Sequence, residues 1–418
     1  MVRYCVPYLL AMTTLLGLAR GLQARQSTGD LQQANATAMH DGRSRAGYVG
    51  DVACSSCHQR QATSYGLTSH HLTSQPATEG SLLGSFVDGS NILTIADPGA
   101  SPATPHLYFK MERRDTGYYQ TAVAENGSQR LTKSARIDLV IGSGVRGQTY
   151  LYWTDNQLYE LPVSYWSEGH RWINSPGYKD GTANFARRVD PRCLECHTTY
   201  IKPLSRDPQT NFYDKTSLVT GISCESCHGP GEEHIALEKS SSAMKETGES
   251  DILNPAKFDR ERRVDQCALC HNGTQREEVA PAFSYFPGRP LDDYLAPNPM
   301  DTVEHPDVHG NQVGLLKRSR CYLTSPLMTC STCHNVHAPE LTIAQYSSRC
   351  LTCHQWKTCG VASKLGSSIR RNCIDCHMPM EQTNSIVSET AGRALRTTIR
   401  NHWIKIYPTS GRGDGSSF

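Results

Sequence analysis

Residues 330–377 read CSTCHNVHAPELTIAQYSSRCLTCHQWKTCGVASKLGSSIRRNCIDCH, and this stretch contains the motif Cys-x-x-Cys-His three times. Four further copies lie upstream, which gives seven in a chain of 418 residues. Two thiols at this spacing, followed directly by an imidazole, are the attachment signature of c-type haem. The thiols form thioethers with the porphyrin, and the histidine binds the iron. The sequence therefore predicts seven covalently bound haem c groups.

We number the predicted haems 1 to 7 in chain order. Each needs two thioether cysteines and one proximal histidine. The predicted cysteines are Cys54, Cys57, Cys193, Cys196, Cys224, Cys227, Cys267, Cys270, Cys330, Cys333, Cys350, Cys353, Cys373 and Cys376. The predicted proximal ligands are His58, His197, His228, His271, His334, His354 and His377.

Zinc is the main alternative for paired cysteines. A zinc site built from such pairs uses two of them per ion, and it has no need of a histidine directly after each pair. Here every Cys-x-x-Cys is followed by histidine. The pattern therefore favours haem over structural zinc.

Ten histidines lie outside the motifs, enough to supply a second axial ligand to all seven irons. His337 follows His334 by only three residues, so it is too close to reach the opposite face of its own haem and is placed to bind a neighbouring one. His234, just after the third motif, follows the same reasoning. The favoured distal ligands are His70 or His71 as alternatives for one site, and His234, His309, His337 and His402.

The first 24 residues, MVRYCVPYLLAMTTLLGLARGLQA, have the pattern of a secretory signal peptide. A basic residue precedes an apolar stretch at about residues 6–18, and this stretch is shorter than the roughly 20 residues that span a bilayer. No later segment is long and apolar enough to do so. We therefore expect an exported protein, periplasmic or extracellular, with no transmembrane helix in the mature chain.

Two cysteines remain after the motifs and the signal peptide are set aside. They are Cys321 and Cys359, on either side of the fifth and sixth motifs. An exported chain meets an oxidising compartment, in which disulfides form. We expect these two thiols to be joined; the alternative is two unpaired thiols.

The charge of the chain argues against nucleic-acid binding. Its formal net charge is +2 at pH 7. Each oxidised haem with two ionised propionates adds about one negative charge, so the protein with its haems is acidic. Phosphate backbones attract basic surfaces, and no nucleic-acid partner is expected.

The motifs divide the chain unevenly, with one haem followed by a long gap and then a cluster of six. In the gap, segments such as HLYFKMERR and QTYLYWT alternate apolar and polar residues between tight-turn sequences, a pattern typical of antiparallel strands. Gly142-Ser-Gly-Val-Arg-Gly147 matches a dinucleotide fingerprint by letter, but a strand-like run follows it, which favours a hairpin turn.

The predicted fold is therefore a mainly α-helical and irregular multihaem cytochrome c fold organised by haem packing, with a small β-rich insertion. The predicted parts are a signal peptide (1–24), a flexible lead-in (25–47), a first haem segment (48–83), the β-rich insertion (84–166), a six-haem cluster domain (167–405) and a flexible tail (406–418).

The segments CLECHTTY (193–200), GISCESCHGPGEEH (221–234), MTCSTCHNVH (328–337) and NCIDCHMPM (372–380) support a resemblance. Over about residues 50–80 and 190–405 the chain resembles multihaem cytochromes c related to the tetrahaem electron acceptor of hydroxylamine oxidoreductase, a superfamily that includes pentahaem nitrite reductase and octahaem enzymes. The resemblance implies stacked and perpendicular haem pairs with two histidines on each iron. The Cys-x-x-Cys-Lys motif of the nitrite reductases is absent, and no tyrosine can be assigned a cross-link.

These observations predict an exported heptahaem cytochrome that carries electrons between redox partners, such as other cytochromes or membrane quinol-linked donors. It is expected to be an electron carrier rather than a catalyst, and the sequence assigns no catalytic residue. Two alternatives stay open. One is an oxidoreductase that acts on a small nitrogen or sulfur compound at an iron with an open coordination position, and the other is a cytochrome subunit of an envelope or extracellular assembly.

Overall fold

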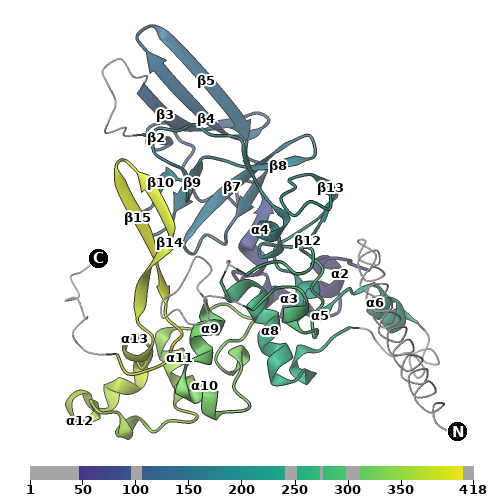
Figure 1. Ribbon diagram of the computed structural model, residues 1–418, viewed down its shortest axis with the longest axis vertical. Helices are drawn as coiled ribbons and strands as arrows, with labels where there is room; N and C mark the ends of the chain where they lie inside the picture. The colour runs from purple at the N-terminus through teal and green to yellow at the C-terminus, as the bar shows by residue number, and fades with distance from the viewer. Residues whose placement is uncertain (1–46, 96–105, 241–251, 274–275, 298–310, 408–418) are drawn as a thin grey trace, which may run out of the picture. The chain divides into compact units, whose positions relative to one another are not determined.

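The structure is a computed structural model that describes residues 47–95, 106–240, 252–273, 276–297 and 311–407 (Figure 1). It contains about 28% helix and about 29% strand. The strands form antiparallel sheets of seven, four, two and two strands. The prediction of a mainly α-helical fold with one small β insertion is therefore wrong.

A four-stranded antiparallel sheet has the order β2-β3-β4-β5. Its turns are the ones that the sequence indicates, with Gly117 and Gly127 in the left-handed region at φ 128° and 58°. These positive φ angles cost glycine no steric strain. The strands are β2 (Ile92–Thr94), β3 (His106–Arg114), β4 (Gly117–Asn126) and β5 (Gln129–Arg136).

The seven-stranded sheet contains the glycine-rich sequence at residues 142–147. This sequence joins β6 to β7 as an antiparallel pair, which confirms the predicted hairpin turn. Its strands are β1 (Ser74–Pro76), β6 (Leu139–Ile141), β7 (Gly147–Thr154), β8 (Gln157–Glu160), β9 (Val163–Trp166), β10 (Arg171–Asn174) and β11 (Arg187–Arg188).

Two apolar clusters hold these sheets. The first packs the four-stranded sheet against the larger one, with Phe109 and Met111 of β3 against Val140 and Tyr150. The second packs the other side of the larger sheet, through residues such as Leu158, against the segment that carries the second motif. We call residues 106–220 the β region.

Two hairpins were missed by the sequence prediction and account for much of the error. They are β12 (Thr198–Pro203) with β13 (Tyr213–Thr220), between the second and third motifs, and β14 (Met380–Thr390) with β15 (Arg393–Arg400), after the seventh. The sequences MEQTNSIVSET and RALRTTIR show no clean apolar alternation. β14 instead docks on β10 through hydrogen bonds: Asn174 N–H donates to Thr390 Oγ1 at 2.9 Å, and Ser388 Oγ donates to Asn174 O at 2.7 Å.

Most helices are short, because haem attachment needs only about one turn at each motif. The helices that contain motif residues are α2 (Asp51–Ser55), α4 (Pro191–Glu195), α5 (Cys224–His228), α8 (Arg260–His271), η5 (Cys330–Thr332), α11 (Ile343–Cys350) and α13 (Ile374–His377). The others are α3 (Gln59–Tyr65), η1 (His71–Thr73), α6 (Glu232–Lys239), η2 (Pro255–Lys257), η3 (Leu291–Asp293), α9 (Gln312–Lys317), α10 (Arg320–Thr324), η6 (Trp356–Thr358), α12 (Ala362–Leu365) and η7 (Gly366–Arg371).

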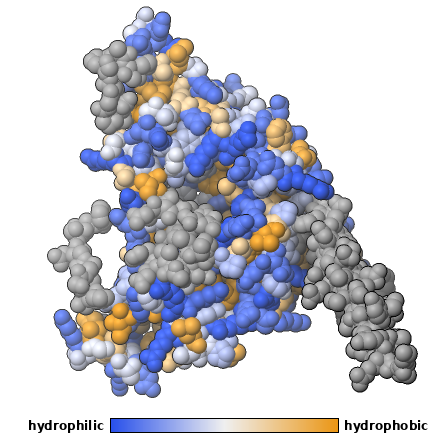
Figure 2. Space-filling model, viewed as in Figure 1, coloured by the Kyte–Doolittle hydropathy of each residue, from blue (hydrophilic) through white to orange (hydrophobic). Residues whose placement is uncertain are grey.

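Residues 320–377, which we call the C-terminal lobe, hold motifs five to seven and have little apolar core. Within this fully described stretch only Ile369 and Ile374 are buried apolar side chains. Leu323 and Leu327 are instead 69% and 83% exposed. Apolar residues also reach the surface in the part of the molecule where α10 to α12 lie (Figures 1 and 2). Leucine is among the residues most often fully buried in folded proteins, so the shortage of buried apolar side chains in the lobe is the feature to explain.

Candidate haem-binding sites

Four motif histidines each face a histidine from another part of the chain. The ring centroids are 6.3 Å apart for His58 and His234 and 6.0 Å apart for His228 and His337. The other two pairs are His271 with His70, at 6.0 Å, and His334 with His402, at 6.3 Å.

This spacing is the one that a shared metal requires. A metal–imidazole bond is about 2 Å long, and the bonding nitrogen lies about 1.1 Å from its ring centroid, so two rings on opposite sides of one iron have centroids about 6 Å apart. Ordinary aromatic pairs have centroids about 4.5–7 Å apart, so the recurrence of this spacing at four motif histidines, rather than any single distance, points to iron. The residues present therefore fit an iron between the two rings of each pair.

The pairs join distant segments. Four of the predicted distal residues, His70, His234, His337 and His402, each face a motif histidine, and His337 faces the third motif rather than its own. Of the alternatives His70 and His71, the structure brings His70 to a motif histidine. The predicted distal ligand His309 lies outside the described residues.

Several motif histidines are oriented through the ring nitrogen Nδ1. That of His228 lies 2.7 Å from Leu253 O, and that of His377 lies 2.8 Å from Lys405 O. A carbonyl can only accept, so Nδ1 carries the proton in both rings and the lone pair is on Nε2. Metal-bound histidines commonly have such a partner, which fixes tautomer and ring orientation.

Burial favours the uncharged form of three facing histidines, His402, His70 and His337. Burial lowers the pKa of His402 to about 4. Burial also lowers the pKa of His70 and of His337. A neutral imidazole has the lone pair that a metal needs, so these side chains are ready to bind iron at neutral pH.

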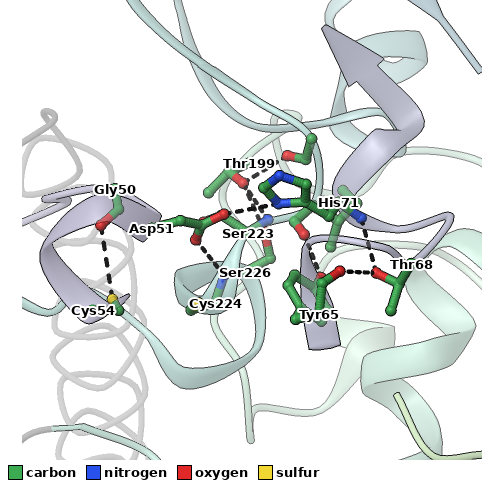
Figure 3. A network of polar contacts seen from close by, with 12 residues as sticks. Gly50, Asp51, Cys54, Tyr65, Thr68, His71, Thr199, Ser223, Cys224 and Ser226 are labelled. Carbon is green, nitrogen blue, oxygen red and sulfur yellow. Dashed lines mark hydrogen bonds and ion pairs between the residues drawn. The ribbon is translucent and has the colours of Figure 1, made fainter. Parts of the chain in front are cut away.

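His71 contributes to a polar network that joins the first and third motifs (Figure 3). Its Nδ1 lies 3.1 Å from Asp51 Oδ2, while Cys224 N–H donates to Asp51 Oδ1 at 3.0 Å. The pKa of Asp51 is lowered: burial works against this, but hydrogen bonds from His71 and Cys224 outweigh it. Tyr65 completes the network by donating its hydroxyl to the carbonyl of Ile222.

Glu225, which lies between the two cysteines of the third motif, holds the backbone just before the first motif. Its carboxylate accepts from the backbone N–H groups of Val49, Gly50 and Gly231, each at 2.9 Å. The side chain is almost fully buried, at 1% exposure. Nothing in the motif pattern distinguishes this residue, and sequence reasoning missed it.

Cysteines of different motifs come together in three places. Their thiols lie within hydrogen-bonding distance, so the porphyrins attached to them would lie side by side. The three contacts join Cys54 to Cys224, Cys196 to Cys270 and Cys267 to Cys330. They correspond to haem positions 1 and 3, 2 and 4, and 4 and 5.

The remaining motifs continue this series at longer range. Cys227 of the third motif acts electrostatically on Cys267 of the fourth. Cys350 of the sixth motif likewise interacts electrostatically with Cys333 of the fifth and with Cys373 of the seventh. Within the described residues, neither His354 nor His377 has a second histidine ring in contact, and His71, His106 and His170 take part in none of the four pairs.

The expected disulfide between Cys321 and Cys359 is not formed. Both residues are free thiols. Cys321 lies on α10 within electrostatic range of Cys353, whereas Cys359 acts on Cys373. The two thiols therefore lie beside different motifs, and the sequence could not show this because separation along the chain does not fix distance in space.

The facing histidine pairs differ from the ligand set of a structural zinc site. The described residues contain no group of three or more histidine, cysteine or acidic side chains that could hold a metal ion. A structural zinc site needs four ligands around one point. Histidines facing each other in twos are what a porphyrin iron requires, since the macrocycle supplies the other four ligands.

Comparisons with known proteins agree with this chemistry. Residues 173–229 match the family described as cytochrome c554 and c-prime. The chain is 25% identical over 195 residues to the multiheme cytochrome MtrA of Shewanella baltica, covering 43% of this chain and 56% of MtrA. It is 27% identical over 94 residues to the C-type polyheme cytochrome OmcC of Geobacter sulfurreducens, covering 22% of this chain and 11% of OmcC.

A solved structure shares the fold. The crystal structure of the outer cell wall cytochrome OcwA aligns with a TM-score of 0.50 and 16% identity, covering 86% of this chain and 79% of that one. The chain thus spans about half the length of MtrA and about a tenth of OmcC. Among the residues that the structure describes, no helix is long and apolar enough to cross a membrane.

The specific resemblance to the family around hydroxylamine oxidoreductase is not confirmed, because the family match covers residues 173–229 alone, the stretch that holds motifs two and three. The broader likeness rests on the repeated motif, the relatives and the shared fold together. By these findings the chain is a multihaem c-type cytochrome that binds haem covalently.

Proposed function

We propose that this protein is an exported heptahaem cytochrome that carries electrons through a continuous chain of haems between redox partners. The observation that carries the proposal is the set of four histidine pairs at the spacing of a shared iron. An iron with two histidine ligands has no position open to substrate, and it has a low potential compared with histidine–methionine ligation. Such irons suit electron transfer.

The contacts between motifs suggest the route. Haems 1, 3, 4, 5, 6 and 7 would form a continuous series. In each successive pair of motifs, a cysteine of one is in contact with a cysteine of the other or close enough to interact with it electrostatically. Haem 2 would branch from haem 4 through the contact of Cys196 with Cys270. The proposed route therefore has ends at haems 1, 2 and 7.

Export and redox partners are part of the proposal. The pattern of the first 24 residues supports secretion. The name of OcwA places that relative in an outer cell wall. An exported protein of this kind would exchange electrons with other cytochromes or with membrane quinol-linked donors. These are the partners that we propose.

The ligand assignment can be tested at His337, the proposed distal ligand of haem 3. In the protein with His337→Ala we expect all seven thioether-bound haems to stay attached, while one iron becomes high-spin and binds carbon monoxide when reduced. Electron paramagnetic resonance and intact mass give the two readings. His170→Ala, at an exposed turn of the β region, is the control and should change neither. A low-spin spectrum in the His337 variant would contradict the assignment.

A second candidate function has one observation in its favour. His354 and His377 have no facing histidine within the described residues, so haem 6 or haem 7 could have an open position. An open iron would allow reduction or oxidation of a small nitrogen or sulfur compound. A stoichiometric high-spin signal in the unmodified protein, with turnover of nitrite or hydroxylamine above about 1 per second, would favour this oxidoreductase over the carrier.

A further inference from the structure

The C-terminal lobe has a strongly uneven charge. Between Glu340 and Asp375 the sequence contains no acidic residue. The same stretch contains five basic residues, all exposed, namely Arg349, Lys357, Lys364, Arg370 and Arg371. We call these five the basic patch.

The cations of the patch are not neutralised within the protein. None of the five forms an ion pair with an acid among the described residues, and the two nearest acids in the sequence are engaged elsewhere. Asp375 pairs with Arg400 at 2.9 Å, and Glu340 accepts from the hydroxyl of Tyr346. Haems 6 and 7 with ionised propionates would add about two negative charges, fewer than the five positive ones.

The patch surrounds the attachment points of haems 6 and 7. Arg349 directly precedes Cys350, and Arg371 lies two residues before Cys373. Two apolar side chains lie among the cations: Val361 is 37% exposed and Leu365 is 44% exposed. An apolar centre with a polar, solvent-accessible rim is the usual anatomy of a protein interface.

We infer that the basic patch is the docking surface for an acidic redox protein that exchanges electrons with haem 6 or haem 7. This inference rests on the proposed function, because it requires haems in the lobe. Cations around an electron-exchange point attract a negatively charged partner and speed its encounter, and the effect weakens as salt screens it. Complementary charge also selects the orientation in which the partner docks.

A second copy of this chain is the competing occupant. α6, beside the third motif, carries acidic residues such as the exposed Glu232, so an opposite charge is present on the same molecule. We favour the redox protein because the patch lies at one proposed end of the haem series, where electrons must enter or leave. Self-association is therefore an outcome that the test must detect.

The test uses the full-length protein with its haems. Plant-type ferredoxin, which is acidic and strongly reducing, serves as the probe, and its second-order rate of electron transfer to the oxidised protein is measured by stopped flow. The variant carries Lys357→Glu, Lys364→Glu, Arg370→Glu and Arg371→Glu. The control carries four reversals on exposed cations of the β region, Lys133→Glu, Lys202→Glu, Arg206→Glu and Lys215→Glu.

We expect the patch variant to react about tenfold more slowly than the unmodified protein at low ionic strength, and the difference to shrink as salt rises. The control should change by less than about twofold, because its cations lie away from haems 6 and 7. The basic mitochondrial cytochrome c, used to oxidise the reduced protein, should react faster with the patch variant.

Three results would overturn the inference. The first is equal slowing in the patch variant and the control. The second is a ferredoxin rate that neither variant changes. The third is sedimentation showing that the unmodified protein self-associates and the patch variant does not, with ferredoxin rates unchanged. Failure of the proposed function itself would be distinct, because the purified protein would then show no haem absorbance or no reduction by any donor.

Discussion

The β region and the C-terminal lobe are stabilised in different ways, although both belong to the same chain. In the β region, two apolar clusters fill the space between and behind the sheets, and side chains such as Phe109 and Tyr150 are fully buried. In the lobe, two apolar side chains are buried and others, such as Leu323 and Leu327, are exposed. Burial of apolar surface is the main favourable term in folding, and the lobe lacks most of it.

This difference indicates what the haems contribute to stability. A porphyrin is a large apolar plate, and three of the seven motifs lie in the 58 residues of the lobe. Haems placed there would cover side chains such as Leu327. The β region would fold through its own core, while the lobe would need its cofactors.

The largest effect expected from this comparison follows loss of the haems. If the chain is produced without haem attachment, we expect trypsin to cut within the lobe at Arg349, Lys357 and Lys364 and to leave a protected fragment that contains the β region and the strands β1 and β2 that pair with it. Mass spectrometry of the fragments checks this. With haems attached, both regions should resist. A lobe that resists trypsin without haems would show that our account of its stability is wrong.

A core substitution should separate the regions in the opposite direction. Phe109 is fully buried in the first apolar cluster, so Phe109→Ala should lower the free energy of unfolding of the β region by about 3–5 kcal/mol. The haem absorbance of the folded protein should stay unchanged. Leu131→Ala, at a side chain 74% exposed on the same sheet, is the control and should cost little. Thermal unfolding followed by tryptophan fluorescence gives the comparison.

A smaller loss of stability is expected from removing the hydrogen bonds of Ser319, the residue directly before the lobe. The buried hydroxyl of Ser319 donates to His402 O at 3.1 Å and accepts from Ile404 N–H at 2.8 Å. Ser319→Ala should cost about 1–3 kcal/mol, because a buried N–H loses its partner. It should also loosen His402 and give haem 5 a partial high-spin signal in electron paramagnetic resonance. Ser348→Ala, at an exposed hydroxyl on α11, should give neither effect.

The smallest effect concerns pH and the β region alone. Glu160 on β8 is largely buried, 3.2 Å from Arg187, and burial raises its pKa to about 7. A carboxyl with a raised pKa favours the folded state while it is protonated. Its contribution is therefore present below about pH 4.5 and is lost as the pH rises through 7, by roughly 1–3 kcal/mol.

Glu160→Gln should remove this dependence. We expect the melting temperature of the unmodified β region to fall from pH 5 to pH 8 by several degrees more than that of the variant. The difference between the two proteins is the relevant quantity, since other groups titrate in both. Equal slopes would show that Glu160 ionises without cost in the folded protein.

Parts of this structure could be predicted from sequence because the signals are local. A motif of five residues identifies haem attachment, and the alternating segments HLYFKMERR and QTYLYWT identified β3 and β7. The hairpin β14–β15 was missed because its sequence is polar on both faces, and its position depends on Asn174, more than two hundred residues earlier.

The arrangement of the candidate haem sites could be predicted only in part, because it depends on contacts between residues far apart in the sequence. Its position in the sequence could show that His337 binds a haem other than its own. It could not show that this is the haem of the third motif. The choice between His70 and His71 depends on Asp51, which takes the second of these side chains. Backbone carbonyls that orient the rings, such as Leu253 O, have no residue-specific signal in a sequence.

The four histidine pairs also bear on the order in which the protein can be made. If each pair holds one iron as we propose, each haem closes a loop of about 70 to 200 residues, and closing such loops is slow and costs entropy. His402 lies far beyond its motif histidine His334 in the sequence, so haem 5 would stay incomplete until that later segment had been delivered. Haem 1 would likewise wait for His234. Maturation would then proceed through intermediates in which an attached haem still lacks its second histidine ligand.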